Sequence, residues 1–460
     1  MIARSSRNQS VVILGGGPGG YEAALVAARL GASVTVVDRD GLGGACVLTD
    51  CVPSKALVST AAFMGNLSAG VELGVGVGGA AADLEAVNRR ILALAGAQSA
   101  DIAARLTADG VRILRGTGVL EGPGRVRAEL GDGSVEQLEA DVILLATGAT
   151  PRVMATAQPD GERILTWKQI YALSELPEHL IVVGSGVTGA ELAQAYLGLG
   201  APVTLVSSRD RVLPGEDADA ATVIEDVFRR EGMRVLSQSR MAGVERTDDG
   251  VVVRLEDGRA IDGSHALLAV GSVPQTGGIG LGENGIELTE RGHIEVDGVS
   301  RTSVRGVYAA GDCTGVLPLA SVAAMQGRIA MWHALGDAVT PLRLDVVSAN
   351  IFTSPEIATV GVAQKDVDSG AVDAHTVMLP LSTNPRAKMD NFHDGFVKVF
   401  AQVGSGTVLG GVVVAPRASE LVYPVAVAVQ NHLSVDQLSS TFTVYPSMSG
   451  SVAEAARRLH

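Results

Sequence analysis

The stretch that decides the fold is "SVVILGGGPGGYEAALVAARLGASVTVVDRD", residues 10–40. An apolar run leads into a glycine-rich turn, an alanine-rich segment long enough for about three helical turns, and a second apolar run ending at Asp38. This order predicts a strand, a helix and a second strand, the βαβ unit of a parallel sheet. Gly15, Gly17 and Gly20 have the spacing with which backbone approaches a pyrophosphate at a helix N-terminus. Asp38 is the acid expected on an adenosine ribose, so the stretch favours dinucleotide binding over a turn that serves packing alone.

The same order of elements recurs in "HLIVVGSGVTGAELAQAYLGLGAPVTLVSSRDRVLP", residues 179–214. Its glycines are Gly184, Gly186 and Gly189, with the spacing of the first copy. A lone glycine motif is weak support for nucleotide binding, whereas two copies with matching strands and helices indicate two related nucleotide-binding folds.

The second copy differs from the first at its ribose-binding position. Where the first copy has Asp38, the second has Ser207, followed by Ser208 and Arg209. A carboxylate pairs with the ribose 2′-hydroxyl of NADH, whereas hydroxyls and an arginine tolerate or attract a 2′-phosphate. The sequence therefore predicts NADPH, or both nicotinamide cofactors, at the second site. The alternative, that Arg209 is a solvated surface residue, stays open at this point.

Composition and charge exclude several classes of protein. The net charge of -14 disfavours nucleic acid and anionic membrane surfaces as partners. No apolar run approaches the ~18 residues of a membrane-spanning helix, and glycines end the first apolar run too early for a signal peptide. We therefore expect a cytoplasmic protein without a membrane span, and no metal site is predicted.

Two of the three cysteines lie in "GGACVLTDCVPSK", residues 43–55. Three cysteines cannot build a disulfide framework, and a reducing cytosol keeps ordinary thiols reduced. A bridge between Cys46 and Cys51 would therefore be transient and catalytic. Both could equally be small buried hydrophobic residues, and the pair alone does not decide between these interpretations.

Several stretches together resemble the flavoprotein disulfide reductases, and most closely dihydrolipoamide dehydrogenase. They are "GGACVLTDCVPSK", "ATGATPR", "GSGVTGAELA", "YAAGDCTG" and "FTSPEIATVGV", in the family's order from about residue 10 to the C-terminus. The resemblance implies an α/β protein with two Rossmann-like dinucleotide-binding domains and a C-terminal α+β dimerisation domain, which forms a homodimer. The expected segments are an FAD-binding domain (1–150), an NAD(P)-binding domain (151–275), a return to the FAD-side sheet (276–345) and the dimerisation domain (346–460).

The resemblance also implies which residues bind the cofactors FAD and NADPH or NADH. The FAD-binding positions would be Gly15, Gly17, Gly20, Asp38, Gly118, Thr147 and Gly148, with Asp312 on the ribityl chain and the backbone of Ala320 near the flavin ring. The NAD(P)-binding positions would be Gly184, Gly186, Gly189, Glu191, Ser207, Ser208, Arg209 and Gly271.

The resemblance gives the redox residues their roles. Lys55 would lie near flavin N5 and pair with Glu191, because an ammonium stabilises the anion that forms on hydride arrival and a carboxylate keeps it in place. Without the resemblance, both would be ordinary helix-surface charges. Cys51 would be the charge-transfer thiol and Cys46 the interchange thiol that meets a disulfide substrate. Cys313 has no redox counterpart in the family and is expected to be structural.

The chain departs from dihydrolipoamide dehydrogenase near its C-terminus, where it reads "TFTVYPSMSGSVAEAA". Tyr445 takes the place of the family's catalytic histidine, and Gly450 takes the place of the glutamate that orients it. A phenol with a pKa of about 10 is a poor base near neutral pH, although it can donate a hydrogen bond. General acid–base assistance contributes about 10² to 10⁴ in rate, so lipoamide turnover should be slow while flavin reduction is preserved.

The leading hypothesis is therefore an FAD-dependent NAD(P)H:quinone oxidoreductase, similar to the lipoamide-dehydrogenase-like quinone reductases, in which Tyr445 hydrogen-bonds the quinone. The first alternative is a dihydrolipoamide dehydrogenase or another low-molecular-weight disulfide reductase, working through Cys46 and Cys51. A flavin-binding interaction module without catalysis is a further alternative. It is disfavoured because Lys55, Glu191 and both glycine loops would then have no reason to occur together.

Overall fold

The computed structural model describes residues 9–76 and 78–460, which form two compact units. The first unit holds the described residues up to Pro53 together with Arg89–Arg152 and Ser272–Arg343. The second unit holds Ser54–Asn88, Val153–Gly271 and Leu344–His460. Two helices, α3 (Cys51–Ala69) and α4 (Leu84–Ala108), contribute residues to both.

The first unit is built on a seven-stranded sheet of order β17-β6-β1-β2-β3-β4-β5. Its strands are β1 (Ser10–Leu14), β2 (Ser33–Asp38), β3 (Arg112–Gly122), β4 (Arg125–Leu130), β5 (Val135–Glu139), β6 (Val142–Leu145) and β17 (Val307–Ala309). The strands from β17 to β3 pair in parallel, and β4 and β5 add an antiparallel extension. The central strands β1, β6 and β17 are apolar almost throughout, as is typical of a parallel sheet that is covered on both faces.

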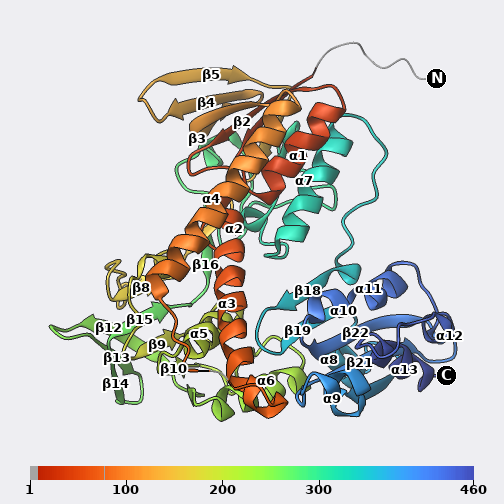
Figure 1. The fold of residues 1–460 in the computed structure, drawn as a ribbon. Helices are drawn as coiled ribbons and strands as arrows, with labels where there is room; N and C mark the ends of the chain where they lie inside the picture. The colour runs from red at the N-terminus through yellow and green to blue at the C-terminus, as the bar shows by residue number, and fades with distance from the viewer. Residues whose placement is uncertain (1–8, 77) are drawn as a thin grey trace. The chain divides into compact units, whose positions relative to one another are not determined.

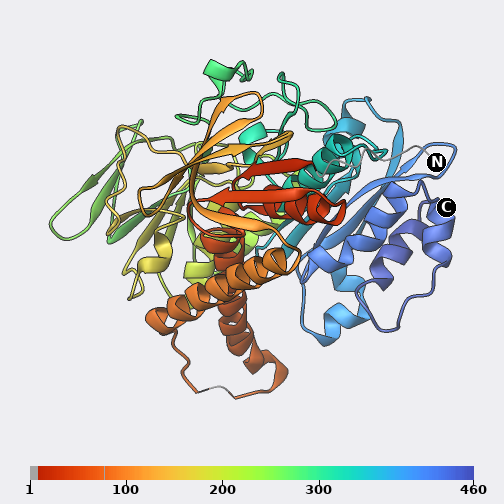
Figure 2. The same ribbon diagram turned by 90° about the horizontal axis from the view of Figure 1, so that it is seen from above.

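Two helices lie side by side against this sheet, α1 (Pro18–Arg29) and α7 (Ala320–Ala334) (Figure 1; Figure 2). A side chain at Gly327 would overlap the backbone of Gly19, so glycine lets the two helices approach closely. Arg328 Nε, on α7, also donates a hydrogen bond of 2.9 Å to Glu22 Oε2 on α1. This unit also contains the short helix α2 (Gly44–Leu48) and the paired strands β7 (Ala149–Pro151) and β16 (Ser272–Pro274).

The second unit contains a five-stranded parallel sheet of order β11-β10-β9-β15-β8 and a three-stranded antiparallel sheet, β12-β13-β14. The parallel strands are β8 (Ile164–Thr166), β9 (Leu180–Val183), β10 (Val203–Val206), β11 (Arg234–Leu236) and β15 (His265–Leu268), with helices α5 (Val187–Leu199) and α6 (Ala218–Arg230). The antiparallel strands are β12 (Met241–Arg246), β13 (Val251–Leu255) and β14 (Ala260–Gly263).

The C-terminal part of the second unit is an antiparallel sheet of order β18-β19-β22-β21-β20 with helices on its apolar face. Its strands are β18 (Ser348–Ile351), β19 (Glu356–Gly361), β20 (Ala374–Pro380), β21 (Phe396–Gln402) and β22 (Val408–Ala415). Its helices are α8 (Gln364–Asp368), α9 (Pro385–Met389), α10 (Ala418–Leu421), α11 (Tyr423–Gln430), α12 (Val435–Ser440) and α13 (Gly450–Arg457). The predicted α/β fold class is confirmed.

Candidate active site

The first glycine loop connects β1 to α1, and its three glycines have different functions. A side chain at Gly15, where φ is 105°, would overlap the carbonyl of Ala146, and one at Gly20 would overlap the carbonyl of Gly15. Gly17 caps the N-terminus of α1, and a side chain there would meet no atom of the described residues within 4 Å. Two glycines therefore allow tight packing, while Gly17 leaves space in front of the helix where a pyrophosphate fits.

The second glycine loop, between β9 and α5, repeats this construction. A side chain at Gly184, with φ of 110°, would overlap the carbonyl of Ala269, and one at Gly189 would overlap that of Gly184. Gly186 caps α5 and again faces open space. The two loops are therefore built alike, as their matching sequences predict.

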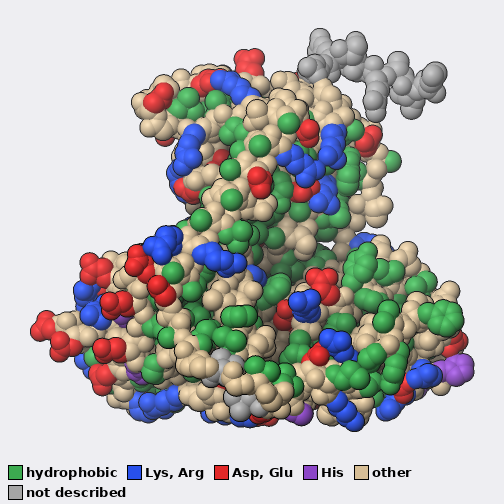
Figure 3. Space-filling model, viewed as in Figure 1, with side chains coloured by type: hydrophobic (Ala, Val, Ile, Leu, Met, Phe, Trp, Pro, Cys, Tyr) green, Lys and Arg blue, Asp and Glu red, His purple; other side chains and the backbone are tan. Residues whose placement is uncertain are grey.

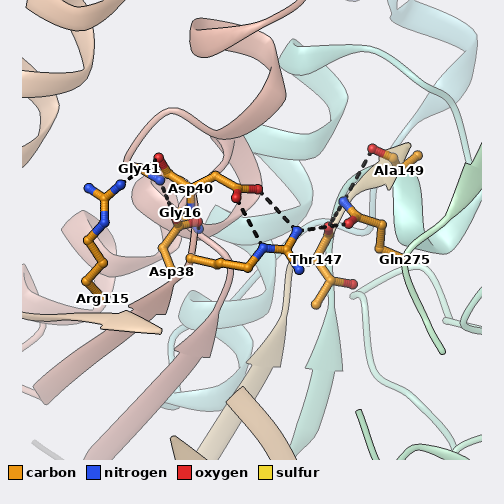
Figure 4. Close-up of polar contacts among 9 residues, drawn as sticks. Gly16, Asp38, Asp40, Gly41, Arg115, Thr147, Ala149 and Gln275 are labelled. Atoms are coloured by element: carbon orange, nitrogen blue, oxygen red, sulfur yellow. Dashed lines mark hydrogen bonds and ion pairs between the residues drawn. The ribbon is translucent and has the colours of Figure 1, made fainter. Parts of the chain in front are cut away.

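Asp38, at the end of β2, organises the turn beside the first loop (Figure 4). Its Oδ2 accepts a hydrogen bond of 2.6 Å from the Gly16 amide. Its Oδ1 accepts from the amides of Asp40 at 3.0 Å and Gly41 at 2.5 Å. The carboxylate is thus fixed next to the glycine loop, where the ribose of an ADP group would lie.

A chain of polar contacts near this turn involves residues that the sequence did not single out (Figure 4). Gln275 Nε2 donates to the carbonyl of Thr147 at 3.0 Å, and its Oε1 accepts from Arg39 Nη2 at 3.4 Å. Arg39 also pairs with Asp40 at 3.1 Å, and Arg115 donates to the Asp40 carbonyl at 3.4 Å. Arg39 could have been identified from the sequence because it directly follows Asp38. The contact between Gln275 and Thr147 could not, because nothing in the sequence connects the two residues.

The remaining positions predicted to bind FAD lie in different surroundings. Asp312 lies in a short 3-10 helix, and burial raises the pKa of its carboxyl while His293 opposes the shift. Ala320 is the first residue of α7, and Gly148 has φ of 71° with open space beside it. Gly118 is needed for packing, because a side chain there would overlap that of Leu14.

The predicted pair of Lys55 and Glu191 is formed. Lys55 Nζ donates to Glu191 Oε2 at 2.7 Å, and the Glu191 side chain is 2% exposed. Glu191 Oε1 accepts from the Phe352 amide at 2.8 Å, and the Lys55 ammonium lies 5.1 Å from the centre of the Phe352 ring. Both carboxylate oxygens are therefore occupied, which holds the ammonium in one place.

Gln194 extends this arrangement by one turn of α5, on the same face as Glu191. Its amide accepts from the Ser354 amide at 2.7 Å and donates to the Ser354 carbonyl at 2.8 Å. Neither this contact nor that of Phe352 could be found from the sequence, because the partners are about 160 positions apart.

The three cysteines lie in different surroundings. Cys46 is in α2 and Cys51 begins α3, and both are half-buried. Cys51 and Lys55 are four residues apart on α3 and therefore share one helix face. Cys313 is fully buried, its Sγ donates to the Ala310 carbonyl at 3.3 Å, and burial raises the pKa of its thiol. These contacts favour a structural function for Cys313.

The predicted cofactor-selecting residues are not equally accessible. Ser207 is fully buried, and its Oγ accepts from Ser185 Oγ at 2.7 Å and from the Arg209 amide at 3.1 Å. Ser208 and Arg209 are exposed. Gly271, after β15, has φ of 93° and open space beside it.

At the C-terminal end, Tyr445 precedes α13 and is 82% exposed, and Gly450 is the first residue of that helix. Within residues 9–76 and 78–460, no group of three or more His, Cys, Asp or Glu side chains could hold a metal ion. Nor does any helix in the described part of the chain have the length and apolar character needed to cross a membrane.

Replacing Gly17 by Ala is expected to abolish FAD binding without unfolding the protein, because the added methyl group occupies the space in front of α1 and touches nothing in the chain. Gly20→Ala is the matched comparison, and it should lower the thermal midpoint because its methyl group overlaps backbone. Flavin absorbance of the purified variants and their thermal unfolding separate the two effects. A yellow Gly17→Ala protein would contradict the placement of the pyrophosphate.

Known proteins are similar to this chain over most of its length. The family described as pyridine nucleotide-disulphide oxidoreductase matches residues 9–327, and its dimerisation domain matches residues 347–456. The chain is 56% identical to a NAD(P)H dehydrogenase (quinone) of Mycobacterium tuberculosis, over 98% of this chain and 93% of that protein. It is 34% identical to a dihydrolipoyl dehydrogenase of Chlorobaculum tepidum, over 97% and 96% of the two chains.

Solved structures agree with these matches. The crystal structure of LpdA from Mycobacterium tuberculosis superimposes with a TM-score of 0.95 at 56% identity, covering 98% of this chain and 100% of that one. The flavoprotein disulfide reductase RclA from Escherichia coli shares the fold, with a TM-score of 0.86 at 23% identity over 98% of this chain and 99% of that one. The predicted arrangement of two dinucleotide-binding domains and a C-terminal dimerisation domain is confirmed, and the chain belongs to the pyridine nucleotide-disulphide oxidoreductase family.

Proposed function

We propose that this protein is an NAD(P)H:quinone oxidoreductase. FAD and NAD(P)H are the cofactors of its family, as the sequence predicts. The observation that carries the proposal is the buried Glu191 that holds the Lys55 ammonium at 2.7 Å, in a chain with Tyr445 where dihydrolipoamide dehydrogenase has its histidine. The greater identity to a quinone dehydrogenase than to a dihydrolipoyl dehydrogenase, 56% against 34%, points the same way.

The residues of the chain have two kinds of role, binding of the cofactors and stabilisation of the charge that develops on the flavin. FAD, when bound, accepts a hydride from the nicotinamide and passes electrons to the acceptor. Lys55 places a positive charge where negative charge develops, and Glu191 together with the Phe352 amide keeps that charge from moving. The open space at Gly17 and Gly186 receives the pyrophosphates of the two dinucleotides.

The residues expected to meet the electron acceptor bear on whether that acceptor is a quinone or a disulfide. Tyr445 offers a hydrogen-bond donor to a quinone carbonyl but no base near neutral pH. The presence of Cys46 and Cys51 supports two other roles. The pair could react with a disulfide substrate, or it could form a bridge that tunes the flavin without contacting substrate. We propose that the quinone oxidises the reduced flavin directly.

We also propose a cytoplasmic homodimer. The dimerisation-domain match supports the homodimer, and hydrophobic side chains gather on this part of the chain over α11 and α12 (Figure 3). Phe442, Val444 and Tyr445 are 102%, 77% and 82% exposed, and Tyr423 is 70% exposed. Such side chains are buried when a second copy covers them. In this arrangement Tyr445 of each subunit completes the acceptor site of the other.

A steady-state comparison of acceptors tests the function. We expect turnover with benzoquinones and naphthoquinones to exceed lipoamide turnover by about 10² or more, because lipoamide needs the missing acid–base pair. Each acceptor is measured with NADH and with NADPH. Equal turnover of lipoamide and quinone would overturn the proposal.

Replacing Cys46 by Ser is the control for this comparison. Because direct oxidation of the flavin by a quinone does not use the interchange thiol, quinone turnover should stay within about threefold of the parent value. A collapse of quinone turnover would move the acceptor to the disulfide.

A further inference from the structure

The turn between β18 and β19, residues 352–355, contacts both members of the pair of Lys55 and Glu191. The Phe352 amide donates to Glu191 Oε1 at 2.8 Å, and the Phe352 ring lies 5.1 Å from the Lys55 ammonium. The pairing of β18 with β19 ends at Ile351 and Ile357, so the strand ladder itself does not hold Phe352. The position of the ammonium therefore depends on what holds this turn.

Gln194 binds the same turn at a second residue. Its Oε1 accepts from the Ser354 amide at 2.7 Å, and its Nε2 donates to the Ser354 carbonyl at 2.8 Å. Helix α5 thus holds the turn at two residues, Phe352 and Ser354. The two helix side chains that do so, Glu191 and Gln194, lie one turn apart on one face. A segment attached at one residue can rotate about that residue, whereas attachment at two residues also fixes its orientation.

Glu231 fixes the orientation of the Gln194 side-chain amide. Gln194 Nε2 also donates to Glu231 Oε2 at 3.1 Å, and Glu231 directly follows α6. The amide nitrogen thus faces two acceptors, and the amide oxygen faces one donor. In the reverse orientation the oxygen would face a carboxylate and a carbonyl, which are acceptors only. The Gln194 side chain, which is 8% exposed, is therefore held in a single orientation.

A positive charge stabilises a developing anion most when it is already in place before the reaction begins. The long side chain of Lys55 has several rotatable bonds, so its ammonium keeps one position only while Glu191 and Phe352 keep theirs. We propose that Gln194 is a positioning residue for flavin reduction, which acts through Phe352 to keep the Lys55 ammonium in place. The inference rests on the proposed position of Lys55 beside the flavin and adds the residue that preserves this position.

The limiting rate of flavin reduction tests the inference. It is measured by anaerobic stopped-flow mixing of the FAD-loaded protein with increasing NADPH or NADH, without an electron acceptor. Gln194→Met keeps the size of the side chain but cannot bind the Ser354 backbone, and it should lower the limiting rate by about tenfold or more. The donor concentration that gives half of this rate should change less than about threefold, because the variant displaces a charge and removes no contact to the dinucleotide.

A double variant shows whether Gln194 acts through Lys55. Lys55→Met removes the charge that Gln194 positions, so adding Gln194→Met to it should slow flavin reduction by less than about twofold further. Independent effects would instead multiply. The thermal midpoint should fall on adding Gln194→Met in either background, because the hydrogen bonds to Ser354 are lost in both.

Asn88→Leu is the matched control, since it also removes a buried side-chain amide. Asn88 is 3% exposed, and its Nδ2 donates to the Leu173 carbonyl at 2.7 Å, a contact that involves neither α5 nor the turn between β18 and β19. The control should lower the thermal midpoint but leave the limiting rate within about threefold of the parent value. Gln194→Ala is a second variant that leaves space for water at Ser354, and it should still lower the rate by about threefold or more.

Two results would overturn the inference alone. The first is a Gln194→Met protein that retains its flavin and is reduced within about threefold of the parent rate, beside a slow Lys55→Met protein. The second is a double variant that is slower than Lys55→Met by the full factor seen in Gln194→Met, since Gln194 would then act independently of Lys55. If Lys55→Met is itself reduced at the parent rate, the proposed position of Lys55 fails together with the inference. No acceptor is present, so none of these results depends on whether the acceptor is a quinone.

Discussion

Replacing Lys398 by methionine is expected to lower the free energy of unfolding by about 3–5 kcal/mol. Lys398 lies on β21, its side chain is 1% exposed, and its ammonium donates to Asp217 at 2.8 Å and Asp219 at 2.7 Å. Asp217 is 4% exposed, so without the lysine its charge is buried and uncompensated. Asp219 is 55% exposed and can return to water. Urea denaturation measured by tryptophan fluorescence gives the change.

Two further variants distinguish the effect of the buried, unpaired charge on the free energy of unfolding from the effect of losing any ion pair. The double variant Lys398→Met with Asp217→Asn should recover most of the loss, because an asparagine keeps the bonds that Asp217 makes to the first turn of α6 without its charge. Arg230→Gln removes an exposed pair with Asp394 and should cost less than about 1 kcal/mol. If Lys398→Met costs no more than Arg230→Gln, the ion pair is not a stabilising element.

Replacing Lys55 by methionine is expected to slow reduction of the flavin by NAD(P)H by about 10²–10³, because the preorganised positive charge is lost where negative charge develops. The methionine keeps most of the volume of the side chain but leaves the Glu191 carboxylate, which is 2% exposed, without its ammonium, so the thermal midpoint of the variant is measured beside the rate. Anaerobic stopped-flow bleaching of the flavin measures the rate of this step alone.

The arginine variant at the same position is the control. Lys55→Arg keeps the charge next to Glu191, and it should lose less than the methionine variant, although its planar head cannot reproduce the contact at 2.7 Å. A Lys55→Met protein whose flavin is reduced within threefold of the parent rate would show that the pair serves only to join α3 and α5.

Local sequence predicted the elements whose geometry depends on neighbouring residues. The two glycine loops and Asp38 follow from patterns within about 30 residues, where backbone conformation is set by the residues themselves. The pairing of Lys55 with Glu191 was implied by family resemblance, since the two residues are 136 positions apart.

Other features depend on tertiary packing and could not be predicted. The burial of Ser207 results from its contact with Ser185 of the adjacent loop, and the contact of Gln275 with Thr147 joins two distant loops. The strands β18 to β20 have no clear local signal because only part of each strand is apolar, and the tail after β22 forms several short helices. Pro424 lies in the first turn of α11, where proline is favoured, whereas it is disfavoured further into a helix.

Asp217 serves two functions with one carboxylate. The Asp217 carboxylate caps the first turn of α6 and also neutralises the Lys398 ammonium on β21. If that turn of α6 frays, the buried Lys398 loses this partner, and its positive charge in the C-terminal antiparallel sheet is no longer neutralised by Asp217. The five-stranded parallel sheet of the second unit and its C-terminal antiparallel sheet, which contains β21, should consequently unfold together in one cooperative transition. The amides at the start of α6 and those of β21 would then exchange their protons with solvent through a common opening event.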